Sequence, residues 1–436
     1  MKKILLTIAA VLTVLAAGAQ DEIKSVPAAT KALSAAREAT QNPKKNTKVA
    51  TWIKYGQALV DAYNAPAGIG IVGIPKDKLA EYGETEKPSS EESVTIGGAR
   101  YDKMVFATKN YYFDESGKLA IIEVTKPIEK DALVEALDAF SQAAKLDNGS
   151  KTKDLVAAIK DITAKFSSDA VSAYSLGDYA KSSICFENAA KASVTAPCTA
   201  LDTNAVYNSG LTAYMGGNTE RAKSMFEKCL GYGYAGTDGE VYVRLADIAS
   251  KAGDADGSKN YLEEGFSKFP QSQGIIVGLI NYYMTTGGNT DRFFELLDIA
   301  KANDPKNASL YYAEGDIHQK LGEYEKAEIA FDKCAEIDPT YEYGYIGKGV
   351  MLYNRAIEFQ ELASNEMDDA KYQEYADQFE KSLKACIEPF EKAYEISKNE
   401  ETRKTVAEFL KNACFRFRTE SEDFQQKYDK YAAIVG

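Results

Sequence analysis

Apolar residues recur along most of the chain at the three- and four-residue spacing of amphipathic helices. A clear example follows Gly322, where Ala327 and Phe331 lie on one helical face and Pro339 comes after the run. Glycine favours a turn, and proline cannot continue the hydrogen-bond ladder of a helix. The pattern therefore predicts a helix that begins after Gly322 and ends before Pro339.

The same pattern returns at intervals of about one helical hairpin. Stepping back 34 residues from Pro339 reaches Pro305, and another 35 residues reach Pro270. Earlier turns at Gly177 and Gly217 precede helices with the same spacing. Five units of two helices follow in register, at residues 163–196, 203–236, 239–272, 274–307 and 308–341. One hairpin cannot bury its apolar face alone, so we expect the units to stack into a common core.

These units resemble the tetratricopeptide repeat (TPR) family. The resemblance is carried by Ala327, Phe331 and Pro339 in the second helix of a unit and by Gly315 in the first. It implies an all-α fold, a TPR-type α-solenoid in which helical hairpins form a right-handed superhelix, with its array at residues 148–341. It also implies a non-enzymatic scaffold that binds peptide or protein partners through its concave face.

The first repeat, at residues 49–147, is interrupted. The segment Trp52–Leu59 matches the start of a first TPR helix, but the matching second helix comes only at Asp131–Leu146. A Gly/Pro-rich stretch and alternating apolar residues fill the gap, at about residues 64–129. Strands are expected at residues 93–96, 101–113 and 118–125, with a hairpin turn at residues 114–117. This predicts a small β-rich insertion, which is either a binding element or a spacer.

The segments on either side of the repeats, residues 20–48 and 342–436, are expected to be helical but do not follow the repeat pattern closely. Residues 20–48 predict a helical lead-in to the first repeat. Residues 342–398 predict an elongated TPR-like unit, in which Pro389 kinks a helix or marks its first turn. Residues 399–436 predict closing helices whose polar outer face caps the stack.

The N-terminus has the pattern of a signal peptide. Lys2 and Lys3 precede an almost unbroken apolar run from Ile4 to Ala17, and small residues follow. We expect a signal peptide at residues 1–19 with cleavage before Gln20, and a periplasmic or otherwise exported mature protein. No other apolar stretch is long enough to cross a bilayer, so we expect no transmembrane segment in the mature chain.

Composition and charge narrow the classes of function. Lys and Arg total 52 against 65 Asp and Glu, which gives a net charge of −13. An acidic surface repels phosphate backbones, so we expect no nucleic-acid partner. The single histidine, His318, leaves little for His-based metal sites or catalysis. An oxidising compartment allows the six cysteines to form disulfides, but each also suits a small buried position, so their pairing stays open.

Two glycine-rich segments look like ligand-binding motifs, but the residues around them do not match those motifs. The segment Gly253–Gly257 looks like a calcium loop, yet Lys259 stands where an EF-hand needs glycine. The segment Gly68–Gly73 has the glycines of a dinucleotide loop but does not join a strand to a helix. No G-x-S-x-G nucleophile motif is present. We therefore expect no catalytic residue, metal or cofactor, although an enzyme site in the β-rich insertion remains an alternative.

The remaining candidate site is the concave face, which the first helices of TPR units line. Tyrosine offers a large flat surface with a hydroxyl group, and asparagine can hydrogen-bond a peptide backbone. In the TPR register the groove-facing positions are Tyr174, Tyr207, Asn208, Tyr214, Arg244, Asp247, Lys251, Tyr282, Tyr312, Asp316, Tyr353 and Asn354. These are our candidate partner-binding residues.

Two kinds of ligand fit this surface. The resemblance to envelope TPR proteins of Gram-negative bacteria implies envelope proteins or peptides as partners, in outer-membrane assembly or secretion. A Tyr-rich surface also stacks on sugar rings, so a glycan-binding module is the alternative. Glycan-binding lipoproteins of similar build usually carry a lipid-anchor cysteine, which is missing near residue 20.

Overall fold

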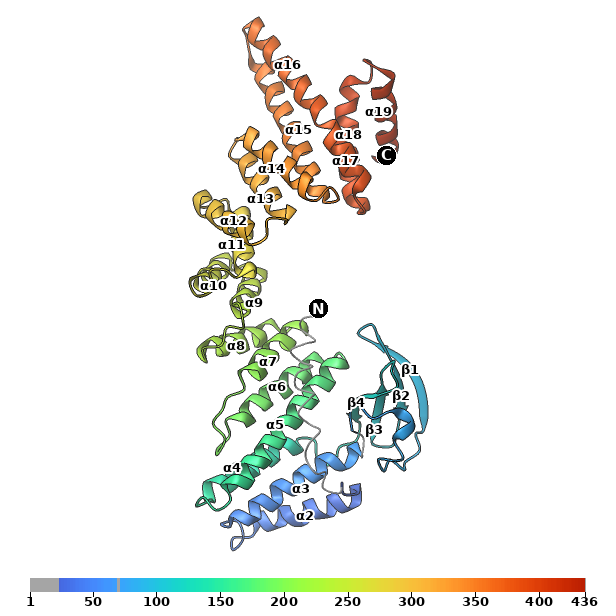
Figure 1. The fold of residues 1–436 in the computed structure, drawn as a ribbon, viewed down its shortest axis with the longest axis vertical. Coiled ribbons are helices and arrows are strands. Elements are labelled where there is room, and N and C mark those ends of the chain that lie inside the picture. Colours follow the sequence, from blue (N-terminus) through green and yellow to red (C-terminus); the bar gives the residue numbers. More distant parts are fainter. Residues whose placement is uncertain (1–22, 69–70, 436) are drawn as a thin grey trace. The chain divides into compact units, whose positions relative to one another are not determined.

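A computed structural model describes residues 23–68 and 71–435 of the chain, and the predicted signal peptide lies outside these residues. The chain divides into two compact units, residues 1–236 (unit 1) and residues 237–436 (unit 2). Figure 1 shows the elements of each unit, and each unit is described by itself below.

Unit 1 is a stack of helices that pack in chain order, with one small sheet beside them. Its helices are α2 (Val26–Gln41), α3 (Val49–Ala67), α4 (Ala132–Leu146), α5 (Thr152–Ser175), α6 (Tyr179–Ser193), α7 (Thr203–Met215) and α8 (Thr219–Gly231). The strands are β1 (Ser90–Ile96), β2 (Ala99–Val105), β3 (Lys109–Phe113) and β4 (Leu119–Val124), after a 3-10 turn, η1 (Lys76–Lys78).

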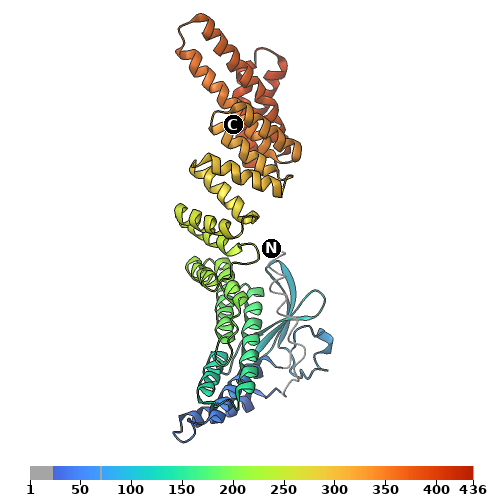
Figure 2. The same ribbon diagram turned by 60° about the vertical axis from the view of Figure 1, so that its left-hand side comes forward.

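The helices α3 and α4 pack against each other as one hairpin, although the whole sheet lies between them in the sequence. A Cβ atom on Gly56 of α3 would lie 2.6 Å from the Phe140 ring of α4, so only glycine allows this approach. Figures 1 and 2 show the sheet beside the helices, and β4 contacts both α3 and α5. The predicted β-rich insertion in the first hairpin is therefore confirmed.

The sheet is antiparallel in the order β1-β2-β3-β4. The single strand predicted at residues 101–113 is wrong, because two strands meet there at a turn over Ala107 and Thr108. The amide of Phe106 donates to the carbonyl of Lys109 at 2.9 Å and closes this turn. Two-residue hairpin turns usually contain glycine or asparagine, and this one contains neither, so the sequence carries no turn signal.

A buried ion pair fixes the sheet to the loop that follows α3. The Lys109 side chain is 4% exposed, and its Nζ lies 2.9 Å from the Glu84 carboxylate. The Tyr111 hydroxyl donates to the Ala67 carbonyl at 2.8 Å and also lies 2.9 Å from Glu84. A buried charge without its partner would be strongly destabilising, so the ion pair fixes the loop to the sheet within the insertion, and the Tyr111 hydroxyl ties both to the end of α3.

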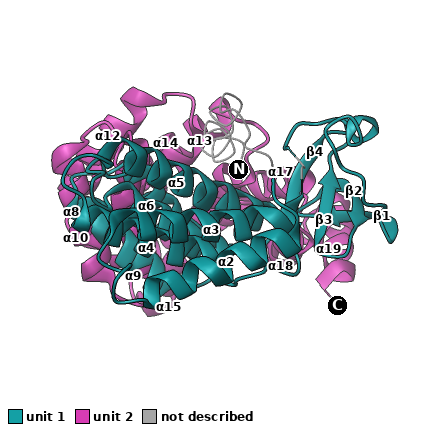
Figure 3. Cartoon of the chain, turned by 90° about the horizontal axis from the view of Figure 1, so that it is seen from below, with its two compact units in different colours: residues 1–236 teal, residues 237–436 magenta. Residues whose placement is uncertain are grey.

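In unit 2 the described residues, 237–435, form helices and the turns that join them. The helices are α9 (Glu240–Lys251), α10 (Ala255–Lys268), α11 (Gln273–Thr286), α12 (Thr290–Asn303), α13 (Ala308–Lys320), α14 (Tyr324–Ile337), α15 (Glu342–Asn365), α16 (Asp369–Ala385), α17 (Ile387–Ile396), α18 (Glu400–Phe417) and α19 (Glu422–Val435). Figure 3 colours the two units separately. Pro389 lies in the first turn of α17, where proline costs no helical hydrogen bond. The predicted fold class, an α-solenoid with a small β-rich insertion, is confirmed.

The cysteines of the chain are all free in the structure, and five of the six are buried. Burial raises the pKa of Cys185 and of Cys229 to about 12, which keeps these thiols protonated near neutral pH. None of the helices among the described residues combines the length and apolar character needed to span a membrane.

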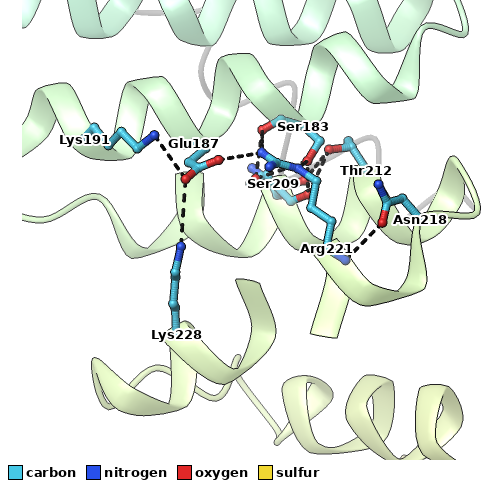
Figure 4. A network of polar contacts seen from close by, with 9 residues as sticks. Ser183, Glu187, Lys191, Ser209, Thr212, Asn218, Arg221 and Lys228 are labelled. Carbon is cyan, nitrogen blue, oxygen red and sulfur yellow. Dashed lines mark hydrogen bonds and ion pairs between the residues drawn. The ribbon is translucent and has the colours of Figure 1, made fainter. Parts of the chain in front are cut away.

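A polar network joins the helices α6 and α8 of unit 1 (Figure 4). The Arg221 guanidinium of α8 lies 2.6 Å from the Glu187 carboxylate of α6 and donates to the Ser183 hydroxyl at 2.7 Å. Lys191 and Lys228 lie 3.1 and 3.8 Å from Glu187. Burial alone would raise the pKa of Glu187, but the bonds from Arg221 and Lys191 outweigh burial and hold the pKa below its ordinary value. The carboxylate is therefore a structural anion.

The side chain of Phe331 fills the space between neighbouring hairpins in unit 2 and is 1% exposed. We predict that Phe331→Ala lowers the free energy of unfolding by about 3–5 kcal/mol, because the ring leaves a cavity. Urea unfolding followed by circular dichroism measures the change. Ile329→Ala on the same helix is the control, since Ile329 is 71% exposed and its loss should cost under about 0.5 kcal/mol. Equal effects of the two changes would contradict the assigned core.

The lowered pKa of Glu187 predicts a pH-dependent contribution to stability. A depressed folded-state pKa stabilises the fold above the unfolded-state pKa, and this stability is lost as the pH falls through the folded-state value. We expect Glu187→Gln to cost about 1–3 kcal/mol at pH 7 and less with each step below about pH 5. Glu220→Gln, at an exposed position of α8, is the control. A cost for Glu187→Gln that persists unchanged at pH 3 would contradict the prediction.

Candidate functional site

A groove of about 400 Å³ opens between α9, α10 and α11 in unit 2. Apolar side chains make its floor: Val243, Ala246, Leu262 and Val277. Polar side chains make its rim: Asp247, Ser250, Asn281, Tyr282, Thr285 and Thr286. An apolar floor with a few polar groups at the edge is the usual make-up of a ligand-binding site.

Two glycines of α11 bring the walls of this groove together. A Cβ atom on Gly278 would lie 2.7 Å from the Leu262 side chain of α10, and one on Gly274 would lie 3.2 Å from Val243 of α9. Any larger residue at Gly278 would push α11 away from α10. The groove is thus shallow and narrow because α11 carries small residues on the side that faces the preceding hairpin.

Side-chain caps fix where the groove helices begin. The Asp254 carboxylate accepts a hydrogen bond from the Gly257 amide at 2.8 Å at the start of α10. Ser272 does the same for the Ile275 amide at the start of α11. Such caps satisfy amides that the helix itself leaves unpaired. Gly253–Gly257, which resembles a calcium loop in sequence, is therefore a helix-capping turn.

The rim of the groove presents hydrogen-bonding groups that the described residues do not satisfy. The Asn281 side chain is exposed and makes no hydrogen bond with another described residue. The Tyr282 side chain is half-buried, and its hydroxyl also makes no hydrogen bond with another described residue. The Tyr282 ring lies edge-on to Tyr283 with centroids 5.3 Å apart. An asparagine amide offers a donor and an acceptor at once, which matches the peptide backbone.

Behind the rim, Tyr283 anchors α11 to the neighbouring helices. Its hydroxyl donates to Glu263 of α10 at 3.1 Å, and Arg292 of α12 lies 3.2 Å from the same carboxylate. Burial raises the pKa of Tyr283, and the nearby charge of Glu263 raises it further, so the hydroxyl stays a donor at neutral pH. The anchored Tyr283 fixes the orientation of its neighbour Tyr282 on the rim.

The structure brings two of the candidate residues, Asp247 and Tyr282, into this groove. Asp247 lies 3.0 Å from Lys251, one turn along α9. Arg244, also on α9, is half-buried and does not line the groove.

The other unit 2 candidates lie on α13 and α15. Tyr312 packs against Phe331, with ring centroids 6.0 Å apart, and Asp316 pairs with Lys320 at 2.9 Å. Tyr353 packs edge-on against a ring of α18, while Asn354 is exposed beside it. Both tyrosines are half-buried and serve the packing between helices.

The unit 1 candidates lie on α5 and α7, mostly as packing groups. Tyr174 contacts Tyr179 edge-on, and Tyr207 packs against the core ring of Phe226. Tyr214 is half-buried. The predicted surface position of Asn208 is wrong. Asn208 is only 4% exposed, because α7 is enclosed by α6 and α8, so its side chain is not at the surface.

Asn281 is a groove residue that is not among the candidates predicted from the sequence. In the TPR register it occupies the position that holds Gly210, Ala246 and Gly315 in other units, where a small buried residue is expected. An exposed asparagine there marks a hairpin that departs from the regular packing. The signal was the polar side chain at a position that holds a small residue in other units, since burying an unpaired amide is costly.

Metal-ligating side chains do not cluster among residues 23–68 and 71–435. No group of three or more His, Cys, Asp or Glu side chains there is placed to hold a metal ion. His318 stacks on Phe294 with ring centroids 4.7 Å apart, and its Nδ1 lies 2.6 Å from the Glu323 carboxylate. These contacts account for the histidine as a structural residue.

Comparison with protein families supports one of the predicted repeat units. The family model of the tetratricopeptide repeat matches residues 308–341. The comparison with curated proteins finds no match.

Among solved structures, YrrB, titled a TPR protein with an unusual peptide-binding site, is 18% identical, with a TM-score of 0.34 over 48% of this chain and 96% of that chain. A tetratricopeptide repeat protein from Parabacteroides merdae ATCC 43184 is 14% identical, with a TM-score of 0.36 over 60% of this chain and 99% of that chain. MamA is 19% identical, with a TM-score of 0.30 over 40% of this chain and 92% of that chain. The chain carries a tetratricopeptide repeat, formed by α13 and α14 at residues 308–341.

Proposed function

We propose that this chain is a non-enzymatic scaffold that binds an extended segment of a partner protein in the groove between α9 and α11. The observation that carries the proposal is the exposed Asn281 beside the half-buried Tyr282, both of which line a groove with an apolar floor. A tetratricopeptide repeat two helices further along the chain supports protein binding as the general role.

The chemistry of the groove favours a peptide backbone over a rigid small molecule. An extended segment repeats a donor and an acceptor at every residue, and Asn281 can satisfy one of each. Thr285, one turn further along α11, and Ser250 on α9 add hydroxyl groups along the rim. Leu262 and Val277 then receive one apolar side chain of the segment, because successive side chains of an extended chain point to opposite sides.

We propose further that the protein acts outside the cytoplasm, in the envelope of a Gram-negative bacterium, in outer-membrane assembly or secretion. The support is the sequence of residues 1–19, with its basic start and apolar run. Removal of Lys2 and Lys3 with this segment would change the net charge from −13 to −15. The partners would be other envelope proteins.

The groove proposal predicts a position-specific crosslink. A photo-crosslinking phenylalanine analogue at Tyr282 should capture a discrete partner in intact cells, because the ring lies on the rim. The same analogue at Ile329, which is 71% exposed on α14, is the control for random contact. Asn281→Ala should reduce capture at Tyr282 by about tenfold, the loss expected for a well-placed hydrogen bond.

Two results would overturn the groove proposal. Equal capture at positions 282 and 329 would show that the groove has no special role. Reproducible glycan binding to the purified protein that is lost in Tyr282→Ala would instead establish the glycan-binding alternative. Partner peptides identified from the crosslink must compete with the captured protein in solution.

The export proposal predicts a shortened protein in the periplasm. Expressed in a Gram-negative host, the protein should be recovered from the periplasmic fraction with Gln20 as its first residue, as measured by intact mass. Replacing the apolar Leu5 and Leu6 by arginine should stop both cleavage and export. Recovery of the uncleaved wild-type chain from the cytoplasm would contradict the proposal without affecting the groove.

A further inference from the structure

The helices α15 and α16 form a hairpin that is longer than the others in unit 2. α15 has 24 residues and α16 has 17, whereas α9 to α14 have 12 to 14 each. At 1.5 Å per residue, α15 is about 36 Å long. Figures 1 and 2 show the looped end of this hairpin extending past the other helices of unit 2. Residues 356–380, which make up this end, are called the arm below.

The arm exposes large apolar side chains. Met367, in the loop at its tip, is 96% exposed, while Tyr372 and Leu362 beside it are 50% and 48% exposed. The interior of the arm is filled by Phe359 and Tyr375, whose rings stack with centroids 6.5 Å apart. The exposed residues are therefore not needed to hold the two helices together. A cluster of exposed apolar residues of this kind marks an interaction site.

The arm and its immediate end are also strongly acidic. Residues 358–381 contain eight acidic residues, Glu358, Glu361, Glu366, Asp368, Asp369, Glu374, Asp377 and Glu380, against Lys371 and Lys381. Three of the acids, Glu361, Asp369 and Glu374, are exposed and form no side-chain hydrogen bond or ion pair with the described residues. The arm thus combines exposed apolar side chains with three carboxylates that have no partner among the described residues.

We propose that the arm is a docking surface for a basic amphipathic helix of a partner protein. Such a helix places apolar residues on Leu362, Met367 and Tyr372 and its Lys or Arg residues against the free carboxylates. The negative charge of the arm disfavours two other partners that an exposed apolar surface could bind, a second copy of the arm and a membrane. A second copy of the arm brings the same negative charge, and an anionic membrane surface repels it in the same way.

This docking surface is separate from the groove between α9 and α11, and it recognises a different feature of a partner. The groove offers mainly the uncharged hydrogen-bonding groups of Asn281, Thr285 and Ser250 to an extended backbone, whereas the arm offers charge and apolar surface to a folded helix. Either proposal can therefore fail alone.

The test uses the full protein and three labelled model peptides of about 18 residues, enough for five helical turns. The first has leucines on one helical face and lysines on the other. The second replaces lysine by glutamate, and the third replaces leucine by glutamine. We expect the leucine–lysine peptide to bind at least tenfold more tightly than either control in fluorescence anisotropy at physiological salt.

Matched variants locate the binding on the arm. Glu361→Gln/Asp369→Asn/Glu374→Gln removes three charges of the arm, and Glu388→Gln/Glu395→Gln/Glu401→Gln removes three exposed charges from α17 and α18. The arm variant should weaken binding about tenfold and reduce its salt dependence, while the control stays within about twofold of wild type. Leu362→Ser/Met367→Ser/Tyr372→Ser should weaken binding tenfold with no change of charge.

Circular dichroism should show unchanged helicity for all three variants, since every replaced side chain is exposed. A benzophenone on the leucine–lysine peptide gives an independent location, and its crosslinks to the wild-type protein should fall in residues 356–380. Equal losses in the arm and control charge variants would show general attraction to an acidic protein and overturn the proposal. Loss of peptide binding in Asn281→Ala would also overturn it, by placing the peptide in the groove.

Discussion

The contact on which the helical stack depends is a phenylalanine ring placed directly on a glycine of a neighbouring helix. A Cβ atom would lie 2.6 Å from the ring at Gly56 against Phe140 and at Gly315 against Phe331, well inside any normal contact distance. The glycine lets two helices approach, and the ring then fills the space between them. Neither residue works alone, because the ring without the glycine clashes and the glycine without the ring leaves a cavity.

The two proposed binding surfaces lie where the regular packing between neighbouring helices is altered or ends. In α11 the glycine at position 278 packs on Leu262 of the preceding hairpin, and the position that normally holds the small residue carries Asn281. The amide is then open to solvent and forms the rim of the groove. In the arm, α15 and α16 extend beyond the helices that would cover them, so apolar residues such as Leu362 remain exposed.

The periodic part of the fold could be predicted from sequence because its constraints are local. The spacing of small and aromatic residues around Phe331 predicted the helical hairpins. The interruption of the first repeat could be predicted because the patterns of its two helices lie far apart in the sequence. The turn at Ala107 and Thr108 was missed because it has no glycine, and its geometry comes from the sheet around it. The exposure of individual residues was harder to predict than the helices and turns. Asn208 is buried by neighbours on both sides, whereas Asn281 is exposed by a change of packing, and neither follows from repeat position alone.

The charge of the chain gives the two surfaces of unit 2 different sensitivities. Free carboxylates on the arm act over about 8 Å at physiological salt, so they influence how fast a basic partner arrives and weaken as salt rises. The groove has one acidic rim residue, Asp247, and its carboxylate already lies 3.0 Å from Lys251. Binding there depends on the hydrogen bonds of Asn281 and on apolar burial, which salt affects little. A scaffold with both surfaces can therefore attract a basic partner by charge and select its extended segment by shape and hydrogen bonding.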